Sequence, residues 1–412
     1  MKSILFLCTS FFFVESALSQ TINQSALFTN SQETAPSASY TISLLLPFDE
    51  ARTNSKLNDF FNSTDANNAK AVQLKNSAVE ALDFYEGFQS AIKLAPPSFE
   101  VKVQVFDVGY NDTLLANVLN DERLSLSNVI VGPSTVTGAK TISDYCKKNR
   151  IINLQPFVIN KNLGNTNPYL LKIEPAIEEH IDRMFKTIVD SFADRKIIVY
   201  CSNKERELTP AYYMDFLLTN YNSKATNKIK HLFINRNDTT VSDSYKDLAT
   251  HADANTVVVY CSYDAAPIEQ ALRLLSREKA TVFGMPTWID NDFLRVDYMN
   301  NATLHFTDIF SVDTSSEQQQ TFDLDYKNTY KHNPTRASYL GYDICEYLFL
   351  SLQLNGLKFA ERAVNNPYKG IGYNFNFGKI YTRTKNDTIF LYYGNKAVHQ
   401  FKINDYQFQL VE

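Results

Sequence analysis

The sequence predicts an α/β protein of two lobes, each a doubly wound parallel sheet with helices on both faces. Short apolar runs of strand length alternate with segments in which apolar residues recur at helical spacing, the pattern of such sheets. The alternation occurs twice, and the second series begins after the long helical segment Ile177–Phe192. The chain has 412 residues, which is enough for two domains of ordinary size.

The first series begins with a compact apolar run at residues 40–46, which Pro47 ends and which we read as a buried strand. The polar residues 49–76 that follow are expected to form a loop or a cap. From Ser77 the apolar residues take a helical period, until Pro96 and Pro97 stop the helix. The remaining elements of the series are strands at 101–105, 128–131, 151–154 and 169–173, and helices at 114–119 and 136–148.

The second series is complete before Glu317. Its strands are expected at 196–201, 229–234, 256–260 and 280–283, and its helices at 210–218, 243–249 and 267–277. A strand at 304–310, two helices at Glu317–Tyr330 and 337–354, and strands at 373–377 and 388–393 follow. The late helix must therefore cover the first sheet, which makes both lobes discontinuous. We expect one lobe from 40–176 plus 308–379, the other from 177–307 plus 380–412, and three crossings between them.

The N-terminus has the features of a secretory signal. Lys2 provides the positive charge, residues 4–14 the apolar run, and Ala17 to Ser19 the small-x-small cleavage site. Residues 1–19 are therefore expected to be removed, and the polar residues 20–39 to form a flexible tether. No other stretch approaches the ~20 apolar residues of a membrane span. We expect a soluble periplasmic protein without a transmembrane segment.

The composition excludes several function classes. The 40 Lys and Arg against 45 Asp and Glu give a net charge of -5, which disfavours nucleic acid as a partner. No nucleophile elbow, Walker loop or dinucleotide-binding glycine motif is present, so we expect no enzyme and no cofactor. The six His show no metal-binding spacing, and no metal site is expected.

Several motifs resemble those of the type 1 periplasmic binding proteins, in the branch of the branched-chain amino-acid receptors. They are VIVGP at 129–133, IINLQP at 151–156, NPYLLKIEP at 167–175, and a Tyr-Tyr-Pro-Gly-Tyr-Asp series from Tyr326 to Asp343. LLLPF at 44–48 and ALDFYEG at 81–87 are similar to a subgroup often fused to LysM peptidoglycan-binding domains, although no LysM segment is visible. The match covers nearly all of 40–412. It implies two α/β lobes with the ligand in the cleft between them.

The resemblance also implies where an amino acid would bind, and the matching positions have changed. The family holds the ligand carboxylate with a Ser at a helix N-terminus, where Val136 stands here, and with a Thr, where Ile159 stands. Its ammonium-binding acid corresponds to Thr287. Two apolar residues would reject a carboxylate, so we expect that free amino acids do not bind.

Eight residues remain as candidates for binding a ligand at the strand ends. Three polar ones flank Val136, and the others lie near positions that the family uses in its cleft. They are Ser134, Thr135, Thr137, Phe157, Arg206, Tyr263, Asp264 and Trp288. For Trp288 we favour ordinary packing over ligand binding, and for Arg206 and Asp264 we favour solvated loop charges.

Two functions fit these observations. The first is a non-enzymatic interaction or scaffold module of the cell envelope with a rebuilt ligand site, associated with an envelope protein or, by family analogy, with peptidoglycan. The alternative is a periplasmic receptor that binds an unidentified small molecule for uptake or sensing. A receptor ectodomain is disfavoured because no membrane span follows the module.

Cys201 and Cys261 end the first and third strands of the second lobe, which are neighbours in a sheet of order 2-1-3-4-5. Their thiols should therefore lie close together. A disulfide, a metal or redox site, and two unbonded thiols are all open, and we favour the unbonded pair.

Overall fold

The computed structural model describes residues 20–21, 38–62, 75–95, 99–159, 163, 166–236, 246–290, 303–383, 387–404 and 407–411. The chain forms two compact units, Met1–Glu174 with Phe310–Lys396 and Pro175–Ile309 with Ala397–Glu412, so it passes between them three times. The expected signal segment lies outside the described residues. Of the expected tether, Gln20, Thr21, Ala38 and Ser39 are described, and all four belong to strands.

The first unit is built on an eight-stranded sheet of order β1-β3-β2-β4-β5-β6-β15-β14. Neighbours from β3 to β15 pair in parallel, whereas the two edge strands β1 and β14 pair antiparallel. The strands are β1 (Gln20–Thr21), β2 (Ala38–Leu46), β3 (Phe99–Asp107), β4 (Val129–Val131), β5 (Ile152–Gln155), β6 (Leu170–Lys172), β14 (Phe377–Arg383) and β15 (Thr388–Asn395).

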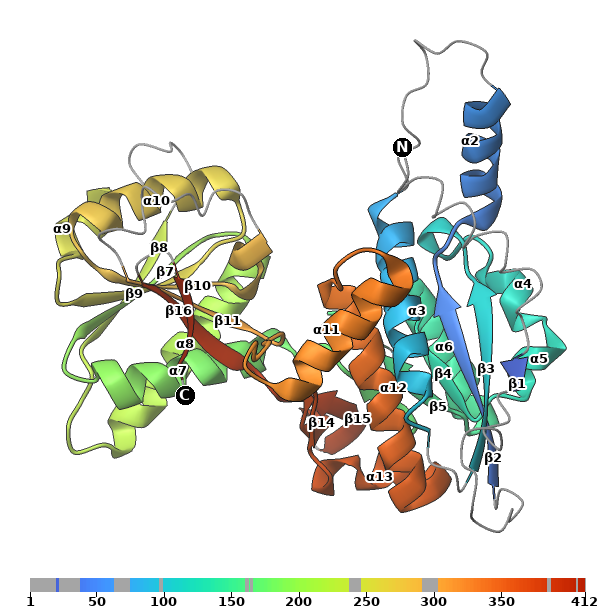
Figure 1. Ribbon diagram of the computed structural model, residues 1–412. Coiled ribbons are helices and arrows are strands. Elements are labelled where there is room, and N and C mark those ends of the chain that lie inside the picture. Colours follow the sequence, from blue (N-terminus) through green and yellow to red (C-terminus); the bar gives the residue numbers. More distant parts are fainter. Residues whose placement is uncertain are drawn as a thin grey trace. The chain divides into compact units, whose positions relative to one another are not determined.

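Helices α3 and α12 lie side by side in the first unit (Figure 1). Their backbones approach closely at two glycines, because a Cβ on Gly87 would lie 1.9 Å from the carbonyl oxygen of Ser338 and one on Gly341 2.0 Å from that of Phe84. The late helix thus belongs to the first unit, as predicted. The helices are α2 (Glu50–Asn62), α3 (Asn76–Ile92), α4 (Leu115–Leu119), α5 (Glu122–Ser125), α6 (Val136–Asn149), α11 (Glu317–Tyr330), α12 (Arg336–Asn355) and α13 (Phe359–Arg362).

Helix α2 corrects one expectation, because a loop or cap was predicted there. The carboxylate of Asp107, at the end of β3, accepts hydrogen bonds from the backbone N–H groups of Asp49 (3.1 Å) and Glu50 (2.9 Å). It thereby satisfies free donors at the start of the helix. The capping residue comes from a distant strand, so the local sequence carries no sign of it.

The second unit contains a seven-stranded sheet of order β17-β16-β11-β10-β9-β7-β8. Figure 1 shows α9 and α10 on one face and α7 and α8 on the other. The five parallel strands follow the predicted 2-1-3-4-5 order, as do β3-β2-β4-β5-β6 in the first unit. The strands are β7 (Lys196–Ser202), β8 (His231–Arg236), β9 (Thr256–Cys261), β10 (Thr281–Gly284), β11 (Thr303–Asp308), β16 (His399–Asn404) and β17 (Gln407–Val411). The helices are α7 (Ile177–Phe192), α8 (Glu205–Lys224), α9 (Lys246–His251) and α10 (Ala265–Arg277).

Residues 380–396 were expected in the second lobe, and this expectation is wrong. Strand β15 pairs in parallel with β6, with Tyr393 opposite Leu171 and Gly394 opposite Lys172. Only β16 and β17 join the second sheet, where β16 pairs antiparallel with β11. The chain therefore crosses for the last time after Lys396. Among the helices that the structure describes, none combines the length and the apolar character needed to cross a membrane.

Candidate functional site

The candidates of the first unit lie where β4 and β5 end and α6 begins. Thr135 is the N-cap of α6, and its hydroxyl oxygen accepts a hydrogen bond from the N–H of Gly138 at 3.0 Å. Ser134, before it, is half-buried, whereas Thr137, in the first turn, is exposed. The sequence therefore placed three polar residues correctly at this helix N-terminus, but only Thr135 has a defined role there.

The carboxylate of Asp112 lies over the first turn of α6. The Thr135 hydroxyl donates a hydrogen bond to Asp112 Oδ2, and that oxygen would lie only 2.0 Å from a Cβ on Gly138. Asp112 is held in a left-handed conformation (φ 59°), as is Asn111 before it (φ 54°). Burial raises the pKa of Asp112, and the hydrogen bonds from Thr135 oppose this shift. A carboxylate of the chain itself thus occupies the end of the helix that attracts anions.

Three further positions of the first unit, Val136, Phe157 and Ile159, follow the ends of β4 and β5. Val136 and Ile159 are exposed, at 38% and 62%. Phe157 packs edge-on against Phe84, with ring centroids 5.1 Å apart. Its N–H donates to Gln155 Oε1 at 3.0 Å, and Gln155 Nε2 donates to the carbonyl of Pro133 at 2.8 Å. The glutamine ties the ends of β4 and β5 together.

In the second unit, Arg206, Tyr263 and Asp264 come together at the ends of β7 and β9. Arg206 and Lys204 both donate to the carboxylate of Asp264, and the Arg206 guanidinium lies 5.7 Å from the centroid of the Tyr263 ring. The bonds from Lys204 and then Arg206 hold the pKa of Asp264 below its usual range. Two cations therefore share one carboxylate on an accessible edge.

Arg206 stands on α8, which begins at Glu205 rather than at Pro210 as the sequence suggested. The first turn is fixed by Glu207, whose buried carboxylate accepts the N–H of Ser202 at 3.0 Å and the hydroxyl of Ser262 at 3.0 Å. This pairing links the ends of β7 and β9 behind the charged group. The contact with Ser262 joins residues 55 apart in the chain, which explains why the sequence pattern placed the start too late.

Trp288 is a packing residue, the second of the two interpretations considered for it. Its side chain is only 1% exposed, its ring packs edge-on against Tyr260 at 5.7 Å, and Nε1 donates to the carbonyl of Ser262 at 2.7 Å. Within its unit the indole therefore presents no ring face for a ligand.

Cys201 and Cys261 face each other across β7 and β9, as predicted. Both are buried, and both thiols are free. Burial raises the pKa of Cys201 to about 12 and that of Cys261 well above its ordinary value. Both thiols are therefore protonated at neutral pH, which removes the thiolate that redox or metal chemistry needs.

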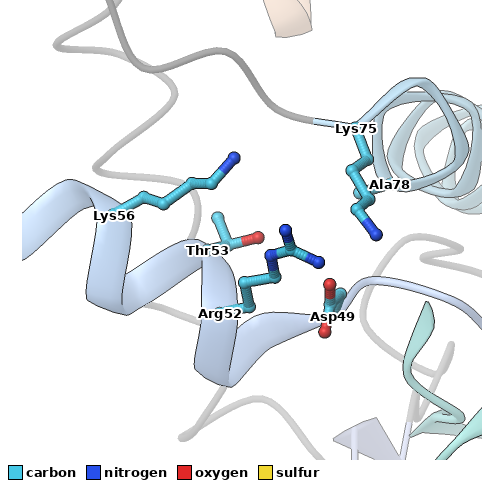
Figure 2. A pocket seen from close by; sticks show the side chains of 6 residues that line it. All are labelled: Asp49, Arg52, Thr53, Lys56, Lys75 and Ala78. Carbon is cyan, nitrogen blue, oxygen red and sulfur yellow. The ribbon is translucent and has the colours of Figure 1, made fainter.

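A small hollow lies between the start of α2 and the start of α3 (Figure 2). Arg52, Lys56 and Lys75 supply three cationic side chains to it, and Asp49 supplies one carboxylate. Lys75 also lies over the ring of Tyr110, with Nζ 2.8 Å from the centroid.

A second cluster, which the sequence analysis did not find, joins Asp83 and Glu86 of α3 to His332, which follows α11. One side-chain ligand atom from each lies within 4.8 Å of the others. Metal-binding motifs that can be recognised in a sequence have ligands a few residues apart, whereas His332 is 246 residues from Glu86. A single sequence gives no signal for such a distant pairing.

Comparison with solved structures supports the fold. A substrate-binding protein of an ABC transporter from Desulfitobacterium hafniense, in complex with Leu, matches with a TM-score of 0.57 and 12% identity, over 90% of this chain and 100% of that one. The leucine-binding protein LivK of Thermotoga maritima gives 0.52 and 15%, over 90% and 98%. The C-domain of LpoA from Haemophilus influenzae, described as a regulator of PBP1A, gives 0.51 and 14%, over 90% and 100%.

Neither a protein-family model nor a curated protein sequence matches the chain. The structural matches show that the chain has the type 1 periplasmic binding protein fold, as its motifs suggested. At these identities the likeness concerns the fold alone. Proteins of this fold include solute-binding proteins and a regulator, so the function has to be argued from the residues.

Proposed function

We propose that this protein is a non-enzymatic module of the cell envelope that acts through contacts with other envelope components, its ancestral ligand site having been rebuilt. One observation carries the proposal: the Asp112 carboxylate occupies the N-terminus of α6. A ligand carboxylate placed there would meet a like charge at close range, which costs several kcal/mol where water is excluded. Export to the periplasm, and a role near peptidoglycan, belong to the same proposal.

An apolar surface on the first unit supports an interaction role. Leu350 and Leu354 are exposed on the last turns of α12, and Leu357 is exposed just after it. The spacing of four residues puts the two helical leucines on one face. Apolar side chains grouped on a surface often mark a protein–protein contact.

Site-specific photo-crosslinking tests this proposal. A benzophenone side chain at Leu354, in the cells that make the protein, should give a discrete adduct with an envelope protein. The same probe at Lys331, an exposed residue at the end of α11, is the matched control. Specific adducts from position 354 alone would support the proposal. Equal labelling from both positions, or none from either, would contradict it.

A periplasmic solute receptor is the second candidate. The accessible group of Lys204, Arg206, Tyr263 and Asp264 favours it, because its two cations and its aromatic ring could bind an acidic or polar solute. Proteins of the same fold have been solved with Leu and with benzoate. A solute that raises the melting temperature of the wild type but not of an Arg206→Ala variant would favour this function.

A further inference from the structure

The cluster of Asp83, Glu86 and His332 lies inside the first unit. Asp83 and Glu86 are three residues apart on α3, so both project from the same helical face. His332 follows Lys331, which ends α11 in a left-handed conformation (φ 70°). Thr335, the N-cap of α12, donates a hydrogen bond to Asp83 Oδ2 at 2.8 Å. The cluster therefore joins α3 to the turn between α11 and α12.

In the described part of the chain, no lysine or arginine balances the negative charge of Asp83 and Glu86. Asp83 is 6% exposed and Glu86 7%, so both carboxyl groups are buried. Among the described residues, neither carboxylate forms an ion pair with a lysine or an arginine. The one basic side chain that pairs with either of them in this part of the chain is His332, with Glu86. Buried carboxylates are ordinarily paired with a cation or bound to a metal ion.

The hydrogen bonds of His332 leave the nitrogen that faces Glu86 available as a ligand. Nδ1 lies 3.1 Å from the carbonyl oxygen of Asn333, to which it donates as an N–H group. The neutral ring then carries its lone pair on Nε2, which lies 3.1 Å from Glu86 Oε2. Two acceptors at this distance need a proton or a cation to hold them together. Metal-binding histidines usually donate their other N–H to a carbonyl in this way.

Hydrogen bonds from neighbouring side chains orient the two carboxylates. Each carboxylate keeps one oxygen that could bind a metal ion. The Tyr326 hydroxyl donates a hydrogen bond to Glu86 Oε2 at 2.7 Å and accepts one from the Ser338 hydroxyl at 2.9 Å. Within the described part of the chain, Asp83 Oδ1 and Glu86 Oε1 accept no hydrogen bond. Each carboxylate thus has one oxygen that accepts no hydrogen bond, and one ligand atom of each of the three residues lies within 4.8 Å of the others.

We propose that Asp83, Glu86 and His332 bind one divalent metal ion of the zinc type. The Nε2–Oε2 separation of 3.1 Å fits two ligands on one ion, since bonds of about 2.0–2.1 Å give ligand–ligand edges of about 2.9 Å in an octahedral site and about 3.3 Å in a tetrahedral one. One imidazole and two carboxylates are a ligand set that zinc accepts, with water completing the shell. The ion would fasten the turn between α11 and α12 to α3.

The test uses Zn²⁺ on the chain 20–412 after removal of metals with a chelator. Titration calorimetry at neutral pH should give one ion per chain, and Zn²⁺ should raise the melting temperature. His332→Gln, a change at a half-buried ring, should weaken binding by at least about 100-fold, since even loss of an outer-shell partner costs about 10–100-fold. Asp83→Asn should also weaken it. His231→Gln is the matched control, because His231 pairs with one carboxylate, Asp215, at 3.3 Å in the other unit.

Three outcomes would overturn the proposal. The first is that the wild type neither binds Zn²⁺ nor gains thermal stability from it. The second is undiminished binding by folded His332→Gln, which would place the ion elsewhere. The third is a stability that depends on pH through His332 but is the same with and without Zn²⁺, which would mean that a proton alone holds the cluster. Should Asp83→Asn fail to fold, a difference in visible absorption between the Co²⁺-substituted wild type and Co²⁺-substituted His332→Gln still reports whether His332 is a ligand.

Discussion

The hydroxyl of Thr135 donates a hydrogen bond to the carboxylate of Asp112, and the pair closes the N-terminus of α6. In a sheet of this kind the ends of the parallel strands and the helix N-termini beside them are the places where ligands bind. Thr135 caps the helix from within the chain, and the Asp112 carboxylate lies over its first turn. The arrangement therefore adds a second reason, besides the apolar positions Val136 and Ile159, to expect that free amino acids do not bind.

Replacement of Gly138 by Ala should disturb this closure. The new Cβ would lie 2.0 Å from Asp112 Oδ2 and 2.9 Å from the Pro133 ring, so the carboxylate or the helix must move. We expect the free energy of unfolding to fall by about 1–3 kcal/mol, measured by urea denaturation. Gly378→Ala is the control, because its Cβ would meet only the flexible end of Lys396. Equal losses in the two variants would contradict a special role for the Asp112 contact.

Asp343 of α12 should be essential for the first unit. Its buried carboxylate accepts the backbone N–H groups of Ile371 (2.9 Å), Gly372 (2.9 Å) and Tyr373 (2.7 Å). In Asp343→Asn an amide NH₂ would face some of these donors, and we expect a loss of about 2–4 kcal/mol in urea denaturation. Asp144→Asn, at an exposed position of α6, should cost almost nothing. A mild effect at 343 would show that the segment after α13 can be held by other contacts.

His305 should make the second unit sensitive to acid. Burial, reinforced by the charge of Lys402, lowers its pKa from 6.5 to about 4. The neutral ring, stacked on Phe283 at 4.5 Å, stabilises the fold fully above pH 6.5, and this contribution is lost as the pH falls through about 4. The loss should reach about 3 kcal/mol.

Comparison of unfolding curves between pH 7 and pH 4 tests this expectation about His305. The decline should be shallower in His305→Leu than in the wild type, even where the variant starts from a lower stability at neutral pH. His251→Leu, which removes an exposed histidine of the same unit, should leave the slope unchanged. Parallel curves for His305→Leu and the wild type would show that this ring is not responsible.

The thiols should be inert in the folded protein. Cys146, Cys201, Cys261 and Cys345 are buried and free, and burial raises the pKa of each thiol. A thiol reagent should therefore react slowly with the native chain 20–412 and should count four thiols after denaturation without a reductant. A count of two would establish a disulfide, and peptide mapping would then locate it.

The parallel core of both sheets was predictable because each strand is a continuous apolar run and the connections are regular. This regularity also predicted that Cys201 and Cys261 are neighbours. The failures arose where contacts join distant parts of the chain. Strand β15 belongs to the first sheet because it pairs with β6, and helix α2 depends on Asp107.

The candidate site was predictable to a similar degree. Thr135 was identified as a polar residue at a helix N-terminus, but Asp112 lies 23 residues earlier, in a short 3-10 helix, Tyr110–Asp112, that has no recognisable motif. Arg206 and Asp264 were both named as candidates, but the ion pair between them was not predicted. Asp83, Glu86 and His332 were missed, because only the packing of α3 against the late helices brings them together.

The most direct test of the rebuilt ligand site is titration calorimetry of the chain 20–412 with the common free amino acids, beginning with leucine, isoleucine, valine and glutamate. With the Asp112 carboxylate at the N-terminus of α6 and Val136 and Ile159 at the family's carboxylate positions, no amino acid should give saturable heat. Saturable binding of any of them with a micromolar Kd would contradict this account, since Asp112 would then have to give way to a ligand carboxylate.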